Sequence, residues 1–209
     1  MLGLAAFALA VLLGGAVVLG LALAWPQETE PAAPDPRAAL HVQSVLAQLF
    51  LREAGLTSRQ DPLILTAGDV NAFLAGHVEV RDAPVWPVRV RIGSDEVELG
   101  GATTLGRLLE AGLGSGPTRM LPGFVAGCAV WVSARGQIAV SSGGRAEYLT
   151  QAATIGRQRV PVGVLWRILG GRPGALVWRM PRVVERIDIE PGRLLIRTRR
   201  VGAGRGAPG

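Results

Sequence analysis

Side chains that could carry out chemistry are few in this sequence. The chain of 209 residues contains two histidines, His41 and His77, and one cysteine, Cys128. Neither histidine stands four residues from another metal ligand, and no HExxH or CxxC motif occurs, so no transition-metal site is predicted. There is no lysine for a Ser–Lys dyad, and the serine within residues 112–116 is misplaced for a nucleophile elbow. The sequence therefore predicts a protein that is not an enzyme and uses no metal or cofactor.

Arginine supplies all the permanent positive charge, and it is concentrated toward the C-terminus. Residues 145–209 contain 13 arginines and 4 acidic residues, whereas residues 1–144 contain 9 arginines and 12 acidic residues. A basic face of this kind attracts phosphate-bearing partners. Because a membrane anchor is also predicted, lipid head groups are favoured over nucleic acid. Candidate ligands for an anionic head group are Arg157, Arg159 and Arg167.

The N-terminal segment is long and apolar enough to cross a membrane. Residues 2–25 contain no charged side chain, and about 20 such residues span the hydrocarbon core of a bilayer. We predict a transmembrane anchor over residues 1–25. A cleaved signal peptide, with a small-x-small pattern at 22–24, and a buried core helix are the alternatives. Three acidic residues precede the first arginine, Arg37, which favours a domain on the extracytoplasmic side of the cell membrane.

Composition divides the rest of the chain into three parts. Residues 26–37 are rich in proline and are predicted to form a linker. Residues 38–200 are long enough for one domain with a hydrophobic core, and the glycine-rich residues 201–209 are predicted to be a disordered tail. The single cysteine excludes an internal disulfide, so packing alone must hold the domain together.

Apolar residues at helical spacing predict helices over residues 38–54, 66–76 and 161–169. Thr66, followed three residues later by Asp69, is typical of a capping box at the start of the second helix. Asparagine is a mediocre helix former. We therefore expect the Asn71 amide to tie this helix to a neighbouring strand or loop, with a ligand contact as the alternative.

Alternation of apolar and polar residues predicts strands between these helices. One hairpin is predicted over residues 88–105, a second over 129–141 with its turn at 134–136, and a third with its turn at Pro191-Gly192. A further strand is predicted over residues 148–155. Short turns and the absence of βαβ units predict an α+β fold class, an antiparallel sheet with about three helices packed on it.

Period-two alternation also places one set of apolar side chains on a common face. In the first hairpin, valine, isoleucine and leucine alternate with arginine and glutamate, which is typical of a sheet with one dry and one wet face. What covers the dry face decides whether it is an ordinary core or a binding site. The candidate residues of this face are Val88, Val90, Ile92, Val97, Leu99, Val130, Val132, Ile138 and Val140.

Three segments carry a resemblance, together with the N-terminal anchor and linker. They are LTAGDVNAFL at 65–74, ATIGRQRVPVGVLWRIL at 153–169 and LVWRMPRVVERIDIEPGRLLI at 176–196. In this order they resemble the YpmS-like family of single-pass, extracytoplasmic bacterial proteins, which is similar to the tubular lipid-binding superfamily. The resemblance implies a curved sheet that holds acyl chains in an apolar groove. The chain departs from the family in its abundance of arginine and glycine.

With this resemblance, the predicted function is a membrane-anchored extracytoplasmic protein that binds or shuttles a lipid or another amphipathic ligand. The nine apolar residues would line the groove and the three arginines would meet a head group. The alternative for the dry face is a closed core, with the first helix covering it. The alternative function is a non-enzymatic envelope scaffold that docks a protein partner through the arginine-rich C-terminal face.

Overall fold

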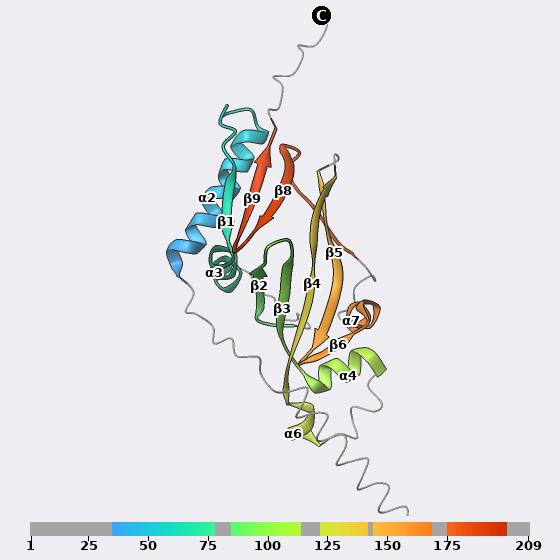
Figure 1. Cartoon of the computed structure of the whole chain (residues 1–209). Helices are drawn as coiled ribbons and strands as arrows, with labels where there is room; N and C mark the ends of the chain where they lie inside the picture. Colours follow the sequence, from blue (N-terminus) through green and yellow to red (C-terminus); the bar gives the residue numbers. More distant parts are fainter. Residues whose placement is uncertain (1–34, 78–84, 114–121, 142–143, 169–174, 200–209) are drawn as a thin grey trace, which may run out of the picture.

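The computed structural model describes residues 35–77, 85–113, 122–141, 144–168 and 175–199. The predicted anchor, most of the predicted linker and the tail lie outside these residues. The described chain is an α+β fold with two antiparallel sheets and several helices, as Figure 1 shows. Within the described ranges, no helix combines the length and the apolar character needed to cross a bilayer.

The smaller sheet has the strand order β1-β9-β8 and is flanked by two helices. Strand β1 (Leu63–Thr66) pairs with β9 (Arg193–Thr198), which pairs with β8 (Val184–Glu190) across the predicted Pro191-Gly192 turn. Helix α2 (Pro36–Glu53) confirms the first predicted helix and begins at Asp35, whose carboxylate accepts a hydrogen bond from the Arg37 amide. Helix α2 packs against helix α3 beside β1 (Figure 1).

Helix α3 (Ala67–His77) confirms both predictions made for this segment. The Asp69 amide donates to the Thr66 hydroxyl, and the Thr66 amide donates to the Asp69 carboxylate, which completes the capping box. The Asn71 side chain accepts a hydrogen bond from the Val90 amide (2.7 Å) and donates one to the Val90 carbonyl (2.8 Å). Because Val90 lies on the edge strand β2, the Asn71 side chain pairs with backbone groups of Val90 that would otherwise have no partner.

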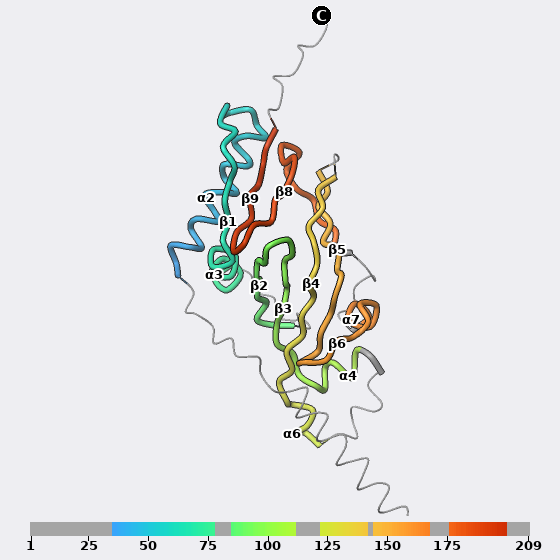
Figure 2. Tube along the Cα trace, in the orientation of Figure 1, coloured from blue at the N-terminus to red at the C-terminus, as the bar shows by residue number. Residues whose placement is uncertain are grey.

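The larger sheet has the strand order β2-β3-β4-β5-β6, with β7 paired to the other end of β5. Its elements are β2 (Val88–Ile92), β3 (Val97–Thr104), β4 (Ala129–Ser141), β5 (Arg145–Ile155), β6 (Gln158–Val160) and β7 (Ala175–Arg179). Strands β4 and β5 extend along much of the molecule in Figure 2. Helices α4 (Leu105–Leu113), α6 (Gly123–Ala126) and α7 (Val162–Ile168) lie at one end of this sheet.

The predicted hairpin over residues 129–141 is wrong. These residues form the single strand β4, which pairs with β5 from Val132 to Ser141. At the predicted turn β4 continues without a break, and its register with β5 shifts between Arg135 and Gly136 because Gln151 of β5 is an extra, unpaired residue, as in a β-bulge. Gly136 allows β4 and β5 to approach closely, and it does not form a turn. A Cβ at this position would overlap the Leu149 carbonyl oxygen and lie 2.8 Å from the Leu149 carbonyl carbon.

Both sheets contribute to one hydrophobic core. Buried residues of the smaller sheet, such as Leu65 and Leu194, belong to the same apolar cluster as Ile92 and Val97 of the larger sheet. The Gly192 amide donates a hydrogen bond to the Ile92 carbonyl and joins the two sheets at this point. This shared core fixes the larger sheet relative to the helices around it.

Candidate ligand-binding cavity

The strand register places the nine predicted groove residues on one face of the larger sheet. Val90 lies opposite Leu99 and Ile92 opposite Val97, and paired residues of antiparallel strands point to the same side. This face is covered differently along its length. Five of the nine residues are buried in the core cluster, namely Val90, Ile92, Val97, Val130 and Val132. Leu99, Ile138 and Val140 are partly buried against that cluster.

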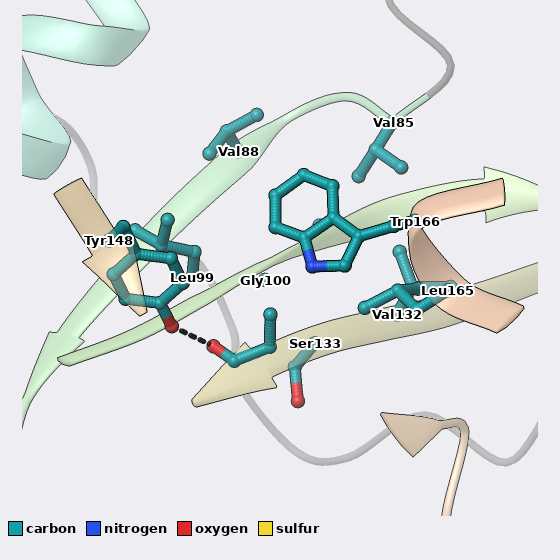
Figure 3. Close-up of a pocket in the computed structure, with 11 residues that line it drawn as sticks. Val85, Val88, Leu99, Gly100, Val132, Ser133, Tyr148, Leu165 and Trp166 are labelled. Atoms are coloured by element: carbon teal, nitrogen blue, oxygen red, sulfur yellow. Dashed lines mark hydrogen bonds between the residues drawn. The ribbon is translucent and has the colours of Figure 1, made fainter. Parts of the chain in front are cut away.

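Part of the face also borders a cavity between the sheet and helix α7, which we call the α7 cavity (Figure 3). Its volume is about 120 Å³, and it is partly open to solvent. Three of the predicted groove residues, Val88, Leu99 and Val132, form part of its wall. The other lining residues are Val85, Gly100, Gly101, Ser133, Ala134, Tyr148, Leu165 and Trp166. The dry face is thus closed core over one part and cavity wall over another.

Helix α7 is held over the cavity by two inward-facing side chains. Leu165 is 1% exposed and Trp166 is 8% exposed, whereas Val164 and Arg167 on the same helix are exposed. Pro161 precedes the helix, where the missing proline amide costs no helical hydrogen bond. Helix α4 packs against α7 and places Leu108 in the core.

A glycine lets the chain before β2 lie close to the sheet at the cavity wall. A Cβ at Gly101 would lie 2.8 Å from the Pro87 carbonyl oxygen and would overlap the Val85 side chain. Any larger residue at this position must therefore displace Val85, which lines the α7 cavity.

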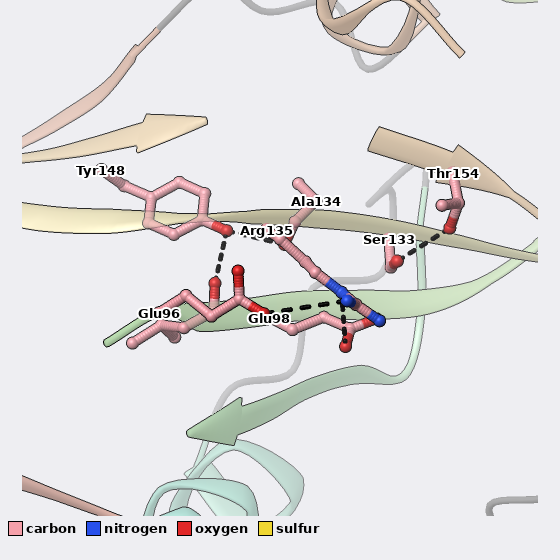
Figure 4. A network of polar contacts seen from close by, with 8 residues as sticks. Glu96, Glu98, Ser133, Ala134, Arg135, Tyr148 and Thr154 are labelled. Carbon is pink, nitrogen blue, oxygen red and sulfur yellow. Dashed lines mark hydrogen bonds and ion pairs between the residues drawn. The ribbon is translucent and has the colours of Figure 1, made fainter. Parts of the chain in front are cut away.

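Three of the residues that line the cavity carry polar side-chain groups, and two of these groups are paired. The Tyr148 hydroxyl hydrogen bonds to the carbonyl oxygens of Ala134 (2.6 Å) and Val97 (2.8 Å), as Figure 4 shows. The Ser133 hydroxyl is 2.9 Å from that of Thr154 on the outer face of the sheet. The indole Nε1 of Trp166 is buried and has no hydrogen-bond partner among the described residues.

Burial raises the pKa of the Tyr148 phenol well above its ordinary value, because the charged phenolate would lose its hydration. The unfolded chain titrates near the ordinary pKa of 10.0 while the folded hydroxyl keeps its proton to higher pH. The folded state therefore binds more protons above this pH, and its stability should fall by at most roughly 1.4 kcal/mol per pH unit. Below pH 10, the contribution of the protonated Tyr148 hydroxyl to stability is fully present.

Two measurements test this prediction for Tyr148. Urea unfolding of the full chain should show a falling midpoint above about pH 10, and Tyr148→Phe should remove most of that fall. Because Tyr148 is the single tyrosine and the chain has no lysine, tyrosinate absorbance reports this group alone and few others titrate nearby. A tyrosinate transition centred near the ordinary pKa in the folded protein would contradict the prediction.

The outer face of the same sheet is polar and internally paired. The Arg135 guanidinium contacts the carboxylates of Glu98 (3.3 Å) and Glu96 (3.7 Å), as Figure 4 shows. The Arg89 guanidinium lies 5.8 Å from the centre of the Trp131 ring on this face. Ion pairs as exposed as these contribute little to stability. We therefore place the candidate binding site on the other face of the sheet, at the α7 cavity.

The three predicted head-group arginines do not gather at the cavity. Arg157, Arg159 and Arg167 are all exposed. Arg159 pairs with Thr154, whose hydroxyl points to the outer face, so Arg159 lies on the side of the sheet opposite the cavity. Of the three, Arg167 alone is on α7, next to Trp166.

Sequence reasoning did not select Tyr148, Leu165 or Trp166 as site residues. Leu165 falls at the apolar spacing of a helix, and Trp166 reads as an ordinary core tryptophan. In the part of the chain that the structure describes, no group of three histidine, cysteine or acidic side chains could hold a metal ion. Comparison of the chain with protein-family models, curated proteins and solved structures finds no match.

Proposed function

We propose that the protein is a membrane-anchored, extracytoplasmic binding protein whose α7 cavity accepts the apolar part of an amphipathic ligand. The observation that carries the proposal is the cavity itself, an apolar space of about 120 Å³ between α7 and the sheet. Val88, Leu99 and Val132, selected from alternation alone, are part of its wall. The apolar N-terminal segment and the resemblance to lipid-binding proteins support a ligand drawn from a membrane.

The size of the α7 cavity limits what it holds. An engineered apolar cavity of about 150 Å³ in another protein binds benzene, so this cavity suits a small apolar group or the end of an acyl chain. Burying about 150 Å² of ligand surface would supply about 4 kcal/mol before the cost of association. A ligand confined to the cavity should bind weakly, and one that extends beyond it gains further buried area.

Filling the cavity should prevent this binding. Val88 is partly exposed at the cavity wall, so Val88→Phe can place a ring in the space without crowding the closed core. Native mass spectrometry of the full chain, incubated with a bacterial lipid extract, should show a stoichiometric adduct for the wild type and at least a tenfold smaller adduct fraction for Val88→Phe, since the ring takes the volume the ligand needs.

Val177→Phe is the matched control for this experiment, because Val177 is 53% exposed on β7 and does not line the cavity. This variant should keep the adduct. An adduct that Val88→Phe retains in full would show that the ligand lies elsewhere. A wild-type protein without any adduct would argue against the proposed function.

A specific observation favours the alternative, a scaffold that docks an acidic partner. Arg145 and Arg179 lie directly opposite each other on β5 and β7, both are exposed, and neither forms an ion pair with a described residue. Like charges in this position are unfavourable without an anion nearby. A ligand-free wild type in the experiment above would leave this alternative the better supported one.

A further inference from the structure

We propose that the exposed face of helix α2 rests on the surface of the membrane to which the chain is anchored, with the helix lying in the plane of the interface. The residues of this face, which we call the α2 apolar face, are Leu40, Leu46, Ala47, Phe50 and Leu51. The inference rests on the membrane anchor of the proposed function and adds a second contact with the bilayer. Helix α2 lies along one side of the molecule, where it packs against α3 and β1 (Figure 1 and Figure 2).

Helix α2 carries more apolar side chains than the core covers. One face of the helix is buried and follows the usual helical spacing of three and four residues. Its residues are Ala39, Val42, Val45, Leu49 and Arg52. Outside that face, Leu40 is 61% exposed and Phe50 is 63% exposed, while Leu46 and Leu51 are 39% and 46% exposed. These four large side chains are therefore not needed for the packing of the domain.

The α2 apolar face is one continuous surface. With 3.6 residues per turn, its five residues fall within an arc of about 140° around the helix axis. No charged side chain falls within this arc, and the polar side chain that does, Gln43, has its amide nitrogen 2.6 Å from His77 Nε2. Exposed apolar residues that are scattered singly need no explanation, whereas a contiguous patch indicates an interaction surface.

The path of the chain favours a bilayer as the occupant of this face. The apolar N-terminal run ends at Trp25, and α2 begins at Pro36. A fully extended chain spans at most about 3.6 Å per residue, so α2 begins within about 40 Å of the membrane boundary. A second contact on so short a tether forms at an effective concentration near the millimolar range, so even a weak attachment is occupied.

The size of the face argues against a second copy of the chain as the occupant. The four large side chains expose roughly 300–500 Å², taking about 150–250 Å² for one whole side chain. A standard protein interface buries about 800 Å² on each partner. A bilayer needs no complementary surface, and leucine and phenylalanine are typical of helices whose apolar face sits about 5–10 Å into the boundary of head groups and acyl chains.

A fluorophore on α2 would report this contact. Cys128→Ser removes the single cysteine of the chain, so Ala47→Cys in that background can be labelled at one site with the fluorophore NBD. Gln48→Cys is the matched control, because the next residue is also exposed but lies outside the arc. In the full chain on phosphatidylcholine–phosphatidylglycerol vesicles, lipids with a nitroxide on the acyl chain should quench the label at residue 47 at least about fivefold more than at residue 48.

Charges on the α2 apolar face should abolish most of this quenching. The double variant Leu40→Glu with Leu51→Glu would have to move carboxylates out of water in order to dock, which is strongly unfavourable. Both positions are exposed, so the domain should keep its thermal stability. Val177→Glu places the same charge on the exposed strand β7 and should leave the quenching unchanged. All these variants should still float with the vesicles, because the N-terminal anchor is intact.

The outcomes distinguish this inference from the proposed function. If the full chain does not float with vesicles, the membrane anchor fails, and with it both the proposed function and the docking of α2. If the chain floats but residue 47 is quenched no more than residue 48, the docking of α2 is overturned and the proposed function stands. Shielding of residue 47 that rises with the protein-to-lipid ratio, without quenching by the lipids, would show that a second copy covers the face and would also overturn the inference.

Discussion

Replacing Gly136 with alanine is expected to destabilise the protein by about 3 kcal/mol, the upper end of the usual cost of overpacking. The added Cβ would overlap the Leu149 carbonyl oxygen and lie 3.0 Å from the Thr150 Cα. These are backbone atoms of the neighbouring strand β5, so no side-chain rotation can relieve the clash. Urea unfolding should show a large drop in the midpoint with little change in slope.

Gly163→Ala is the matched control for Gly136→Ala. Gly163 lies in helix α7, and no atom is within 4 Å of the position that its Cβ would take. Alanine is a better helix former than glycine by about 0.5–1 kcal/mol, so this variant should be as stable as the wild type or more so. A Gly136→Ala protein of wild-type stability would contradict the continuous path of β4 and support the hairpin predicted from the sequence.

The sequence predicted elements whose signals are local. The structure confirms the capping box predicted at Thr66 and Asp69, and it confirms the hairpin turn predicted at Pro191-Gly192. It also confirms the pair of strands predicted from the alternation around Val90. The segment around Gly136 was misread because glycine permits both a turn and a close backbone approach. The neighbour on β5 that decides between these roles lies in a different part of the chain, so composition alone cannot tell them apart.

The candidate site was predictable in part for the same reason. Period-two alternation assigns Val88, Leu99 and Val132 to one face, because side chains of a strand alternate regardless of what lies above it. It does not show what covers that face. Trp166 follows the spacing of a core residue, and only the packed structure reveals that it lines the cavity.

Replacing Leu165 with alanine should destabilise the protein by about 3 kcal/mol and enlarge the α7 cavity. Leu165 is 1% exposed and lines the cavity, and truncating buried leucines costs about 2–5 kcal/mol through lost burial and the space left behind. An apolar ligand that fills this space binds the folded state alone, so it should raise the stability of the variant more than that of the wild type.

Leu49→Ala separates loss of packing from gain of binding space. Leu49 is 2% exposed on α2 and does not line the α7 cavity, so this variant should lose a similar amount of stability. Thermal unfolding would be followed for both variants with and without acetophenone. We expect the ligand to restore several degrees to Leu165→Ala and little to Leu49→Ala, because only the first truncation opens into the proposed binding space. Equal rescue of both variants would mean that the ligand enters any void in the core, and the α7 cavity would then have no special claim as a binding site.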